Sequence, residues 1–288
     1  MSGGPQAEKI RTLFNTIAGD YDRLNHLLSL GIDRTWRKRA LSEILPSTIG
    51  RGTEFDKTGG ASAEDEQPYS VLDVACGTGD FSLEIAGRCV RRAIPCAITG
   101  LDLSEGMLAV MREKVARAGY AEDALLPNAE GASTRGKGVI IATLQGNSEA
   151  MPFADGTFDC VTIAFGIRNF EHREQALREI LRVLKPGGRL VILELSVPAT
   201  PVLRAFYNLY FTHILPLIGG WISGDKAAYR YLPASVLKFP GKEEWMGIMR
   251  SCGYAEVRHK AYTLGICRQY VGVRPASLPL TESEGTRE

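Results

Sequence analysis

The fold of this chain is indicated most clearly by the stretch Ser70-Val-Leu-Asp-Val-Ala-Cys-Gly-Thr-Gly-Asp80. The β-forming residues at its start predict a buried strand, which ends where Gly77 and Gly79 follow. A helical pattern begins directly afterwards, at Asp80. Glycine lets the main chain turn sharply and approach a ligand where a Cβ atom would clash. Such a turn at the carboxyl end of a parallel strand is typical of the nucleotide sites of open α/β sheets.

Two acidic residues indicate which nucleotide this turn would bind. Asp73 lies inside the first predicted strand, and Asp102 ends the next one, in Ile98-Thr-Gly-Leu-Asp102. A carboxylate at that second strand end can accept hydrogen bonds from both hydroxyls of a ribose. A dinucleotide fingerprint would need a third glycine where this chain has Ser82, and no phosphate-binding G-x-x-x-x-G-K-S/T run occurs. The pattern favours S-adenosylmethionine, which has a ribose and an amino-acid end, over the nicotinamide dinucleotide of an oxidoreductase.

Composition excludes several other classes of protein. With 288 residues, 44% of them hydrophobic and 23% charged, the chain has the make-up of a globular enzyme with a substantial core. A formal net charge of +1 gives no electrostatic argument for nucleic acid as a partner. The six cysteines form no C-x-x-C pair, so we expect reduced core residues and no metal site. The N-terminus has no basic-then-apolar signal region, which predicts a cytoplasmic protein.

The middle of the chain alternates between strand and helix patterns. Strands are predicted near 70–75, 97–102, 139–145, 158–165 and 188–195, and helices near 80–92, 104–118, 171–184 and 242–252. This alternation predicts parallel strands joined by crossover helices. Two further strands, near 254–262 and 266–274, would close the sheet as an antiparallel hairpin.

We interpret residues 1–288 as a single domain. Residues 8–45 are helical in pattern throughout and are expected to form an N-terminal cap that could cover the ligand cleft. The third helix within this cap is expected to begin at Asp33 as its N-cap. The remaining parts are predicted as flexible Gly/Ser/acid-rich insertions at 50–68 and 121–138, a cofactor-binding core at 70–195, a lid at 198–240 and a disordered tail at 275–288.

A family resemblance is carried by two sets of motifs. The general set is Val71-Leu-Asp-Val-Ala-Cys-Gly-Thr-Gly-Asp80, Asp102-Leu-Ser-Glu-Gly-Met107, Gly146-Asn-Ser-Glu-Ala-Met-Pro-Phe153, Phe158-Asp159 and Leu184-Lys-Pro-Gly-Gly-Arg-Leu190. The more specific set is Tyr21-Asp-x-x-Asn25, Ser29-Leu-Gly31, Trp36-Arg37, Phe165-Gly-Ile-Arg-Asn169 and Tyr229-Arg-Tyr-Leu-Pro-x-Ser235. With these motifs the chain resembles, from about residue 8 to 274, the ubiquinone/menaquinone biosynthesis C-methyltransferases, and among them the demethylmenaquinone methyltransferases. Cys76 and Ala164 are small departures from the family pattern.

The resemblance implies a class I S-adenosylmethionine methyltransferase. Its fold would be Rossmann-like α/β, with a mostly parallel seven-stranded sheet, helices on both faces and an N-terminal helical extension. The implied reaction is C-methylation of a polyprenyl quinol ring, from demethylmenaquinol to menaquinol. A benzoquinol of the ubiquinone pathway, or another small acceptor on the same fold, remains an alternative because fold does not fix substrate.

The cofactor-binding residues follow from the motifs that match. We expect the glycine turn and Asp73 to face the methionine end, Asp102 the ribose, Met107 the adenine ring, and Asn147 with Ser148 the adenine edge, while Ser104 caps the next helix. The full set expected to bind the cofactor is Asp73, Gly77, Thr78, Gly79, Asp102, Leu103, Met107, Asn147, Ser148 and Ala164.

The catalytic expectation concerns the charge that develops on a quinol oxygen. A ring carbon becomes a good nucleophile only when a neighbouring hydroxyl loses its proton. Arg168 and Asn169 are expected to stabilise the resulting anion, and because Arg168 stays protonated, a water or a carboxylate must take the proton. Tyr21 and His213 are expected to hydrogen-bond the substrate oxygens.

The expected substrate also suggests a partner surface. Residues 202–222 form the most apolar run of the chain, but Arg204 and His213 argue against a transmembrane helix. This run is either buried core or a lid that lines a channel for a polyprenyl tail and touches the membrane surface. Peripheral contact with the inner face of a membrane, and a homodimer, are kept as hypotheses.

Overall fold

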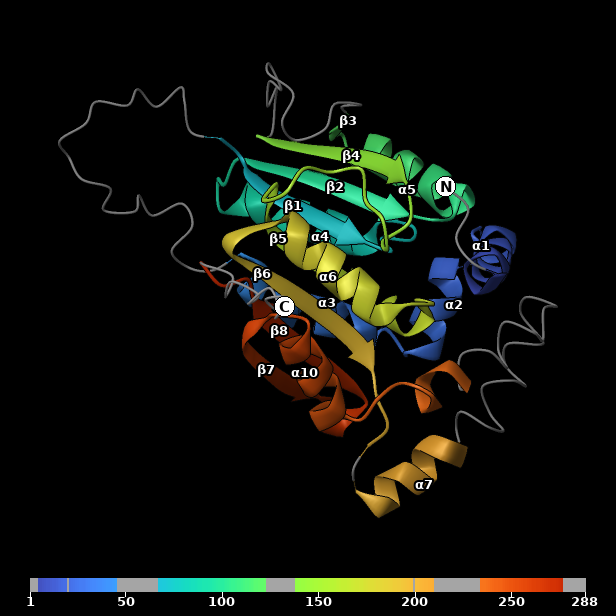
Figure 1. The fold of residues 1–288 in the computed structure, drawn as a ribbon. Helices are drawn as coiled ribbons and strands as arrows, with labels where there is room; N and C mark the ends of the chain where they lie inside the picture. Colours follow the sequence, from blue (N-terminus) through green and yellow to red (C-terminus); the bar gives the residue numbers. More distant parts are fainter. Residues whose placement is uncertain are drawn as a thin grey trace, which may run out of the picture.

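The computed structural model of this chain describes residues 5–19, 21–45, 67–122, 138–198, 200–209 and 234–276. At the centre of these residues is an eight-stranded sheet of order β3-β4-β2-β1-β5-β6-β8-β7 (Figure 1). The strands are β1 (Tyr69–Val74), β2 (Cys96–Asp102), β3 (Ala121–Glu122), β4 (Val139–Gln145), β5 (Phe158–Ala164), β6 (Leu184–Leu195), β7 (Ala255–Tyr262) and β8 (Cys267–Val273). The predicted mostly parallel seven-stranded sheet is confirmed, and the two-residue β3 adds a short edge strand.

Parallel pairing runs through the sheet up to β6, and an antiparallel hairpin closes it. β8 pairs antiparallel with both β6 and β7, as the sequence predicts for the last two strands. The run from Lys185 to Gly188 does not separate two elements. It is an irregularity inside β6: Leu184 pairs with Phe158 of β5, the next pair joins Arg189 to Cys160, and Gly187 between them has a φ of 76°.

Helices cover both faces of the sheet (Figure 1). The principal ones are α1 (Pro5–Ile17), α2 (Tyr21–Leu28), α3 (Ile32–Ile44), α4 (Asp80–Arg91), α5 (Glu105–Arg117), α6 (Arg173–Val183), α7 (Pro201–Leu209) and α10 (Lys242–Ser251), with short 3-10 turns η1 (Ile167–Asn169) and η3 (Thr263–Gly265). Strand β1 shows why two layers form. Val71 and Leu72 are both fully buried, but Val71 packs with α3 and α4 while Leu72 packs with α6 and α10. A strand buried on both faces is apolar throughout, as this one is apart from Asp73 and its first two residues.

The N-terminal helices join this framework through α3. Trp36, Ala40 and Ile44 belong to the same core cluster as α4, so the predicted cap is packed against the sheet and is not an appendage. The prediction that Asp33 caps α3 is wrong. The N-cap is Gly31, with a φ of 72°, and the Asp33 carboxylate instead pairs with Arg37 one turn later at 2.6 Å. Two successive left-handed residues, Leu30 and Gly31, turn the chain into the helix before Asp33 is reached.

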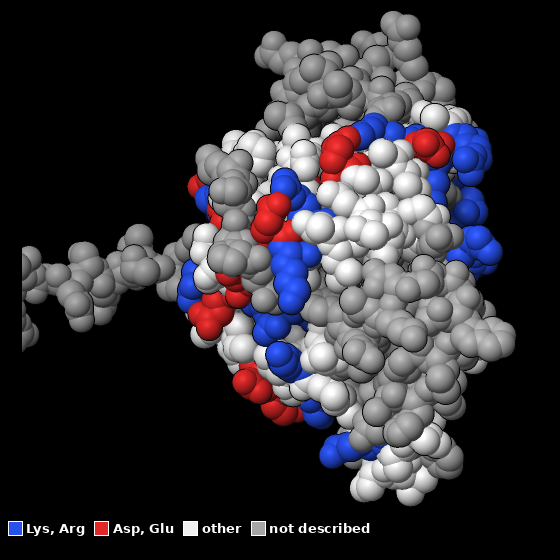
Figure 2. All heavy atoms as spheres, turned by 90° about the vertical axis from the view of Figure 1, so that its right-hand side faces the viewer, with Lys and Arg blue, Asp and Glu red and all other residues white. Residues whose placement is uncertain are grey.

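The carboxyl ends of the parallel strands point towards one side of the molecule. Figure 2 views that side: an area of uncharged side chains lies above and to the right of the centre, with Lys and Arg along its right edge and a mixture of Lys, Arg, Asp and Glu to its left. Within the described ranges, no helix is long and apolar enough to cross a membrane. Both predicted insertions, the predicted tail and most of the predicted lid, including His213, lie largely or wholly outside the described residues.

Candidate active site

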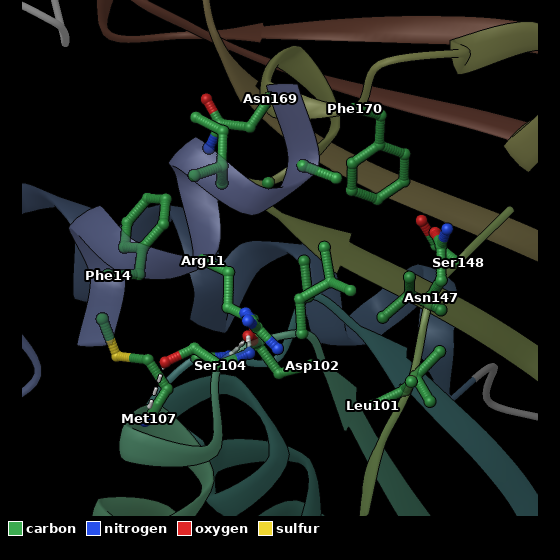
Figure 3. A pocket seen from close by; sticks show the side chains of 18 of the residues that line it. Arg11, Phe14, Leu101, Asp102, Ser104, Met107, Asn147, Ser148, Asn169 and Phe170 are labelled. Carbon is green, nitrogen blue, oxygen red and sulfur yellow. Dashed lines mark hydrogen bonds between the residues drawn. The ribbon is translucent and has the colours of Figure 1, made fainter. Parts of the chain in front are cut away.

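A pocket opens at the carboxyl ends of β1, β2, β4 and β5 (Figure 3). It encloses about 780 Å³ of empty space, part of which is open to solvent. Of the residues predicted from sequence, nine line it: Tyr21, Gly77, Asp102, Leu103, Met107, Asn147, Ser148, Ala164 and Asn169. Five predicted residues are not in its lining or are not described: Asp73, Thr78, Gly79, Arg168 and His213.

The glycine turn forms the floor of the pocket. Ala75, Gly77 and Gly79 all have left-handed φ values, of 53°, 56° and 81°. A Cβ atom on Gly79 would also collide with the side chain of Met111 on α5, so glycine is required there by both conformation and packing. The turn places Ala75 and Gly77 in the pocket lining, while the N–H groups of Gly77 and Gly79 are held by Asp102 and by the Cys76 carbonyl.

Asp102 fixes the turn to the end of β2. Its Oδ2 accepts the main-chain N–H of Gly77 at 2.9 Å, and its Oδ1 accepts that of Ser104 at 2.8 Å. Burial raises the pKa of this carboxyl, and the main-chain N–H groups of Ser104, Gly77 and Leu103 partly offset that effect by stabilising the charged form. A carboxylate has about four acceptor sites in all, so these three N–H groups leave room for a ligand hydroxyl. Asp102 lines the pocket and thus fits the ribose role predicted for it.

Asp73 lies below the pocket. It is 1% exposed, and its carboxylate accepts the hydroxyls of Ser82 at 2.6 Å and Thr162 at 2.9 Å. Burial raises its pKa to about 6, and the two hydroxyl hydrogen bonds act in the opposite direction. Asp73 thus joins β1 to α4 and β5, and its contact with a methionine end stays a prediction. Ser82, at the third position of a dinucleotide fingerprint, is fully buried in this interaction and does not face the pocket.

Thr78 anchors the N-terminal helices to the glycine turn. Its hydroxyl donates to Asp22 of α2 at 2.5 Å and accepts from the Lys114 ammonium at 3.1 Å. Lys114 also pairs with Asp22 at 2.5 Å and with Asp80 at 2.6 Å, while Arg37 of α3 reaches Asp80 at 3.2 Å. Lys114 was not predicted from the sequence because it lies in an ordinary amphipathic helix. This charged network holds α2 and α3 beside the pocket.

Tyr21 begins α2 and faces the pocket. Its ring packs edge-on to Phe14 with a centroid separation of 5.8 Å, and it is the side chain nearest to Gly77. Burial raises the pKa of its phenol, while a hydrogen bond with Asn25 acts the other way. A neutral phenol can donate a hydrogen bond to a substrate oxygen, as the sequence suggests for this residue.

Arg168 and Asn169, adjacent in sequence, lie on different sides of the pocket wall. Asn169 lines the pocket, whereas Arg168 is 8% exposed and is not part of the lining. The Arg168 guanidinium pairs with Glu194 at 2.8 Å, donates through Nε to Ser235 at 3.2 Å, and also donates to the Phe165 carbonyl. Its action on a substrate oxygen therefore stays a prediction, because its observed partners are protein groups.

Several pocket residues were not found by sequence reasoning. The first helix contributes Ile10, Arg11 and Phe14, whose spacing indicates only a packed helical face. Glu149 and Glu171 also line the pocket. These residues carry no local signal of a site, since only the long-range placement of α1 across the strand ends brings it there.

The fold and pocket together define a class I S-adenosylmethionine-dependent methyltransferase. Two solved structures share the fold: the cyclase SpnF, with a TM-score of 0.59 at 15% identity over 95% of this chain and 98% of that one, and a SAM-dependent methyltransferase from Thermotoga maritima, with a TM-score of 0.52 at 18% identity over 92% and 99%. The chain belongs to the ubiE/COQ5 methyltransferase family, whose model matches residues 4–274.

Curated relatives agree over nearly the whole chain. The ubiquinone/menaquinone biosynthesis C-methyltransferase UbiE of Geobacter sulfurreducens is 45% identical, covering 93% of this chain and 89% of that protein. The demethylmenaquinone methyltransferase of Porphyromonas gingivalis is 37% identical, covering 94% of each. The cofactor is thus S-adenosylmethionine. The pocket fits it because the turn at Gly77 lets the main chain come close to a ligand and because the Asp102 carboxylate can accept further hydrogen bonds.

The ribose role of Asp102 predicts a loss of cofactor affinity in Asp102→Asn. Replacing a charged acceptor of two hydroxyls should weaken S-adenosylhomocysteine binding by roughly 10- to 100-fold. Isothermal titration calorimetry measures this, with Glu105→Gln as a control, because Glu105 is an exposed carboxylate three residues further on. Wild-type affinity in Asp102→Asn would remove the ribose assignment.

The buried carboxyl of Asp73 predicts a pH-dependent stability. Its pKa of about 6 exceeds the ordinary value of 3.8, so folding takes up a proton between these values and the free energy of unfolding falls as pH rises through that window. The complete effect, above about pH 6, is ~3 kcal/mol. Asp73→Asn should therefore flatten the profile of urea-unfolding free energy between pH 4 and 6. Parallel profiles for the two proteins would contradict this assignment.

Proposed function

We propose that this chain methylates a ring carbon of a reduced polyprenyl quinol, with demethylmenaquinol as the first candidate. Bound S-adenosylmethionine supplies an electrophilic methyl group, which leaves its sulfur as the new carbon–carbon bond forms. The observation that carries the proposal is family membership over residues 4–274. It is supported by the pocket, in which the expected cofactor residues Gly77 and Asp102 lie together with Asn169 and Tyr21. The names of the relatives from Geobacter sulfurreducens and Porphyromonas gingivalis point to the same class of acceptor.

The chain's own residues would act chiefly by position and by exclusion of water. Phe14, Tyr21 and Phe170 give the pocket apolar walls, which suit a quinol ring. Asn169 and the Tyr21 phenol can hydrogen-bond the ring oxygens, so that the reacting carbon is held near the methyl group. The proton of the quinol hydroxyl would pass to a water or to a carboxylate before transfer. After transfer the methylated carbon would lose its hydrogen as a proton and the ring oxygen would regain one, so that one proton is released overall.

The second candidate is a benzoquinol of the ubiquinone pathway, which the name of the Geobacter relative includes. A panel of short-chain naphthoquinols and benzoquinols, assayed by mass spectrometry for a gain of one methyl group, separates the two. A methylated naphthoquinol supports the first candidate. Turnover of benzoquinols alone supports the second, and no methylated quinol at all would overturn both. The homodimer hypothesis stays a prediction, checked by the mass in solution.

A test of Arg168 must take its ion pair with Glu194 into account. Arg168→Ala alone leaves the Glu194 carboxylate, which is 0% exposed, without its cation, at a cost of about 3–5 kcal/mol. The double variant Arg168→Met with Glu194→Gln removes both charges together and should stay folded. If Arg168 stabilises the substrate anion, kcat falls sharply in both proteins while the S-adenosylhomocysteine Kd stays near that of the wild type. Recovery of kcat in the double variant would instead show that Arg168 serves only to compensate Glu194.

A membrane contact is the second part of the proposal. Leu30, Val202 and Leu264 are 77%, 64% and 73% exposed. All three lie at the carboxyl edge of the sheet. Val202 is in α7, which follows β6, and Leu264 is in the turn between β7 and β8. Leu30 precedes α3, and that helix is tied to the same turn because Trp36 donates to Thr263 at 2.8 Å. Leu264 has a φ of 56°, a conformation that costs a branched residue free energy and that here leaves its side chain exposed. Exposed apolar side chains gathered at one edge of the sheet suit a bilayer surface, and Figure 2 shows Lys and Arg side chains on the same side of the molecule.

Vesicle binding tests this contact. Val202→Asp with Leu264→Asp should reduce co-sedimentation with phosphatidylglycerol vesicles at least severalfold, because each aspartate would enter the interface. Aspartate tolerates the left-handed conformation at position 264. The matched control is Val90→Asp, since Val90 is also apolar and 38% exposed but lies near the end of α4, away from the carboxyl edge. Equal binding by all three proteins would contradict the membrane contact.

A further inference from the structure

Helix α1 crosses the mouth of the pocket from one wall to the other. Ala7, Ile10, Arg11 and Phe14 all line the cavity, and Figure 3 shows Arg11 and Phe14 reaching into it from α1. The helix packs on α5, which begins just after Asp102, and its other end meets the segment that follows η1. The two ends of α1 are thus held on the cofactor side and on the expected acceptor side of the same pocket.

The cofactor-side contact is made by one oxygen of Asn15. Its Oδ1 accepts the Ser104 hydroxyl at 2.6 Å and the main-chain N–H of Gly106 at 3.1 Å. The Ser104 hydroxyl in turn accepts the N–H of Met107, as expected of an N-cap, while the Ser104 main-chain N–H donates to Asp102. A single hydrogen-bonded chain therefore runs from α1 through the α5 N-terminus to the carboxylate assigned to the ribose.

The approach at this contact is close. A Cβ atom on Gly106 would lie 3.1 Å from Asn15 Oδ1 and 3.4 Å from Asn15 Cα. Glycine at this position, one residue inside α5, lets α1 approach the helix start closely enough for Asn15 to accept an N–H that α5 itself cannot pair. An alanine there suits the first turn of a helix but would press against α1.

The acceptor-side contact is made by Glu171. Its Oε2 accepts the main-chain N–H of Ala7 at 3.2 Å, in the first turn of α1. A carboxylate at a helix N-terminus satisfies an N–H without a helical partner and interacts favourably with the helix dipole. Glu171 lines the pocket directly after Asn169 and Phe170, so this contact ties α1 to the wall on which the acceptor is expected.

We propose that α1 is a strap over the bound nucleoside, held by Asn15 on one wall and by Glu171 on the other, which must lift for the cofactor to enter and the product to leave. The inference rests on the proposed cofactor site but not on the identity of the methyl acceptor. α2 would stay in place during opening, because Asp22 is bound to Thr78 and Lys114. Opening therefore concerns α1, whose last residue, Ile17, is followed by Ala18 and Gly19.

Binding kinetics of S-adenosylhomocysteine to the full chain test the strap. Asn15→Ala removes an acceptor of two hydrogen bonds, so the dissociation rate should rise about tenfold. The contacts of Asn15 and Glu171 also hold α1 closed when no ligand is bound. Weakening them should therefore raise the association rate as well, and Kd should change less than either rate. Asn15→Asp keeps the acceptor oxygen and adds a charge favourable to the α5 N-terminus, so its rates should stay within about twofold of wild type. Glu171→Ala and Glu171→Gln should repeat this contrast, and Gly106→Ala should raise both rates.

Thr16→Ala is the control, since Thr16 is exposed on α1 and its hydroxyl bonds only the Thr12 carbonyl of the same helix. Hydrogen exchange gives a second readout: α1 amides should become more protected when S-adenosylhomocysteine binds to the wild type, and less so in Asn15→Ala with Glu171→Ala. Unchanged rates in Asn15→Ala, or faster dissociation with unchanged association, would overturn the strap, because the latter describes a simple ligand contact. Absence of any binding to the wild type would instead overturn the cofactor site itself.

Discussion

The interaction on which this structure depends is the pair of hydrogen bonds that Asp102 accepts from Gly77 and Ser104. These bonds join three elements at one point: the turn after β1, the end of β2 and the start of α5. Burial raises the pKa of this carboxyl, and the main-chain N–H groups act against that effect by stabilising its charged form. A nucleoside can hydrogen-bond to the acceptor sites that Asp102 has left. The protein side chains are already in place, so little conformational entropy is lost on binding.

Around that point, charged side chains hold the N-terminal helices in place. Lys114 and Arg37 each contact more than one acid, and Asp80 is shared between them. Partly buried ion pairs give net stabilisation only when such multiple hydrogen bonds compensate for the loss of water. The result is a division of roles among neighbouring helices. α2 and α3 are fixed to the sheet and the glycine turn, whereas α1 meets the pocket walls through Asn15 and Glu171.

Much of this architecture could be predicted from the sequence, and the exceptions share a physical cause. Val71 and Leu72 give strand β1 its apolar pattern, and Gly77, Asp102 and Asn147 lie at strand ends, which meet at one edge of a parallel sheet whatever their side chains do. Asp73 and Arg168 lie equally close to strand ends, yet both turn to protein partners: Asp73 to Ser82 and Thr162, Arg168 to Glu194 and Ser235. The direction of a side chain depends on partners far along the chain, which local periodicity does not encode. For the same reason, the sequence predicts that the N-terminal helices could cover the ligand cleft, but it does not indicate which α1 residues line the pocket.

The cluster around Arg168 suggests how a general methyl-transfer fold acquires a particular acceptor site. Two of the motifs that carry the family resemblance contribute to this cluster: Arg168 from Phe165-Gly-Ile-Arg-Asn169, and Ser235, whose hydroxyl accepts from Arg168 Nε while the guanidinium pairs with Glu194. Phe165 adopts a left-handed conformation with a φ of 60°, and its carbonyl accepts a hydrogen bond from Arg168. That turn places Asn169 and Phe170 in the pocket lining. The buried charge pair would then act on the acceptor through the shape of the wall, since a side chain that fixes main-chain geometry can be as specific to a substrate class as one that touches the substrate.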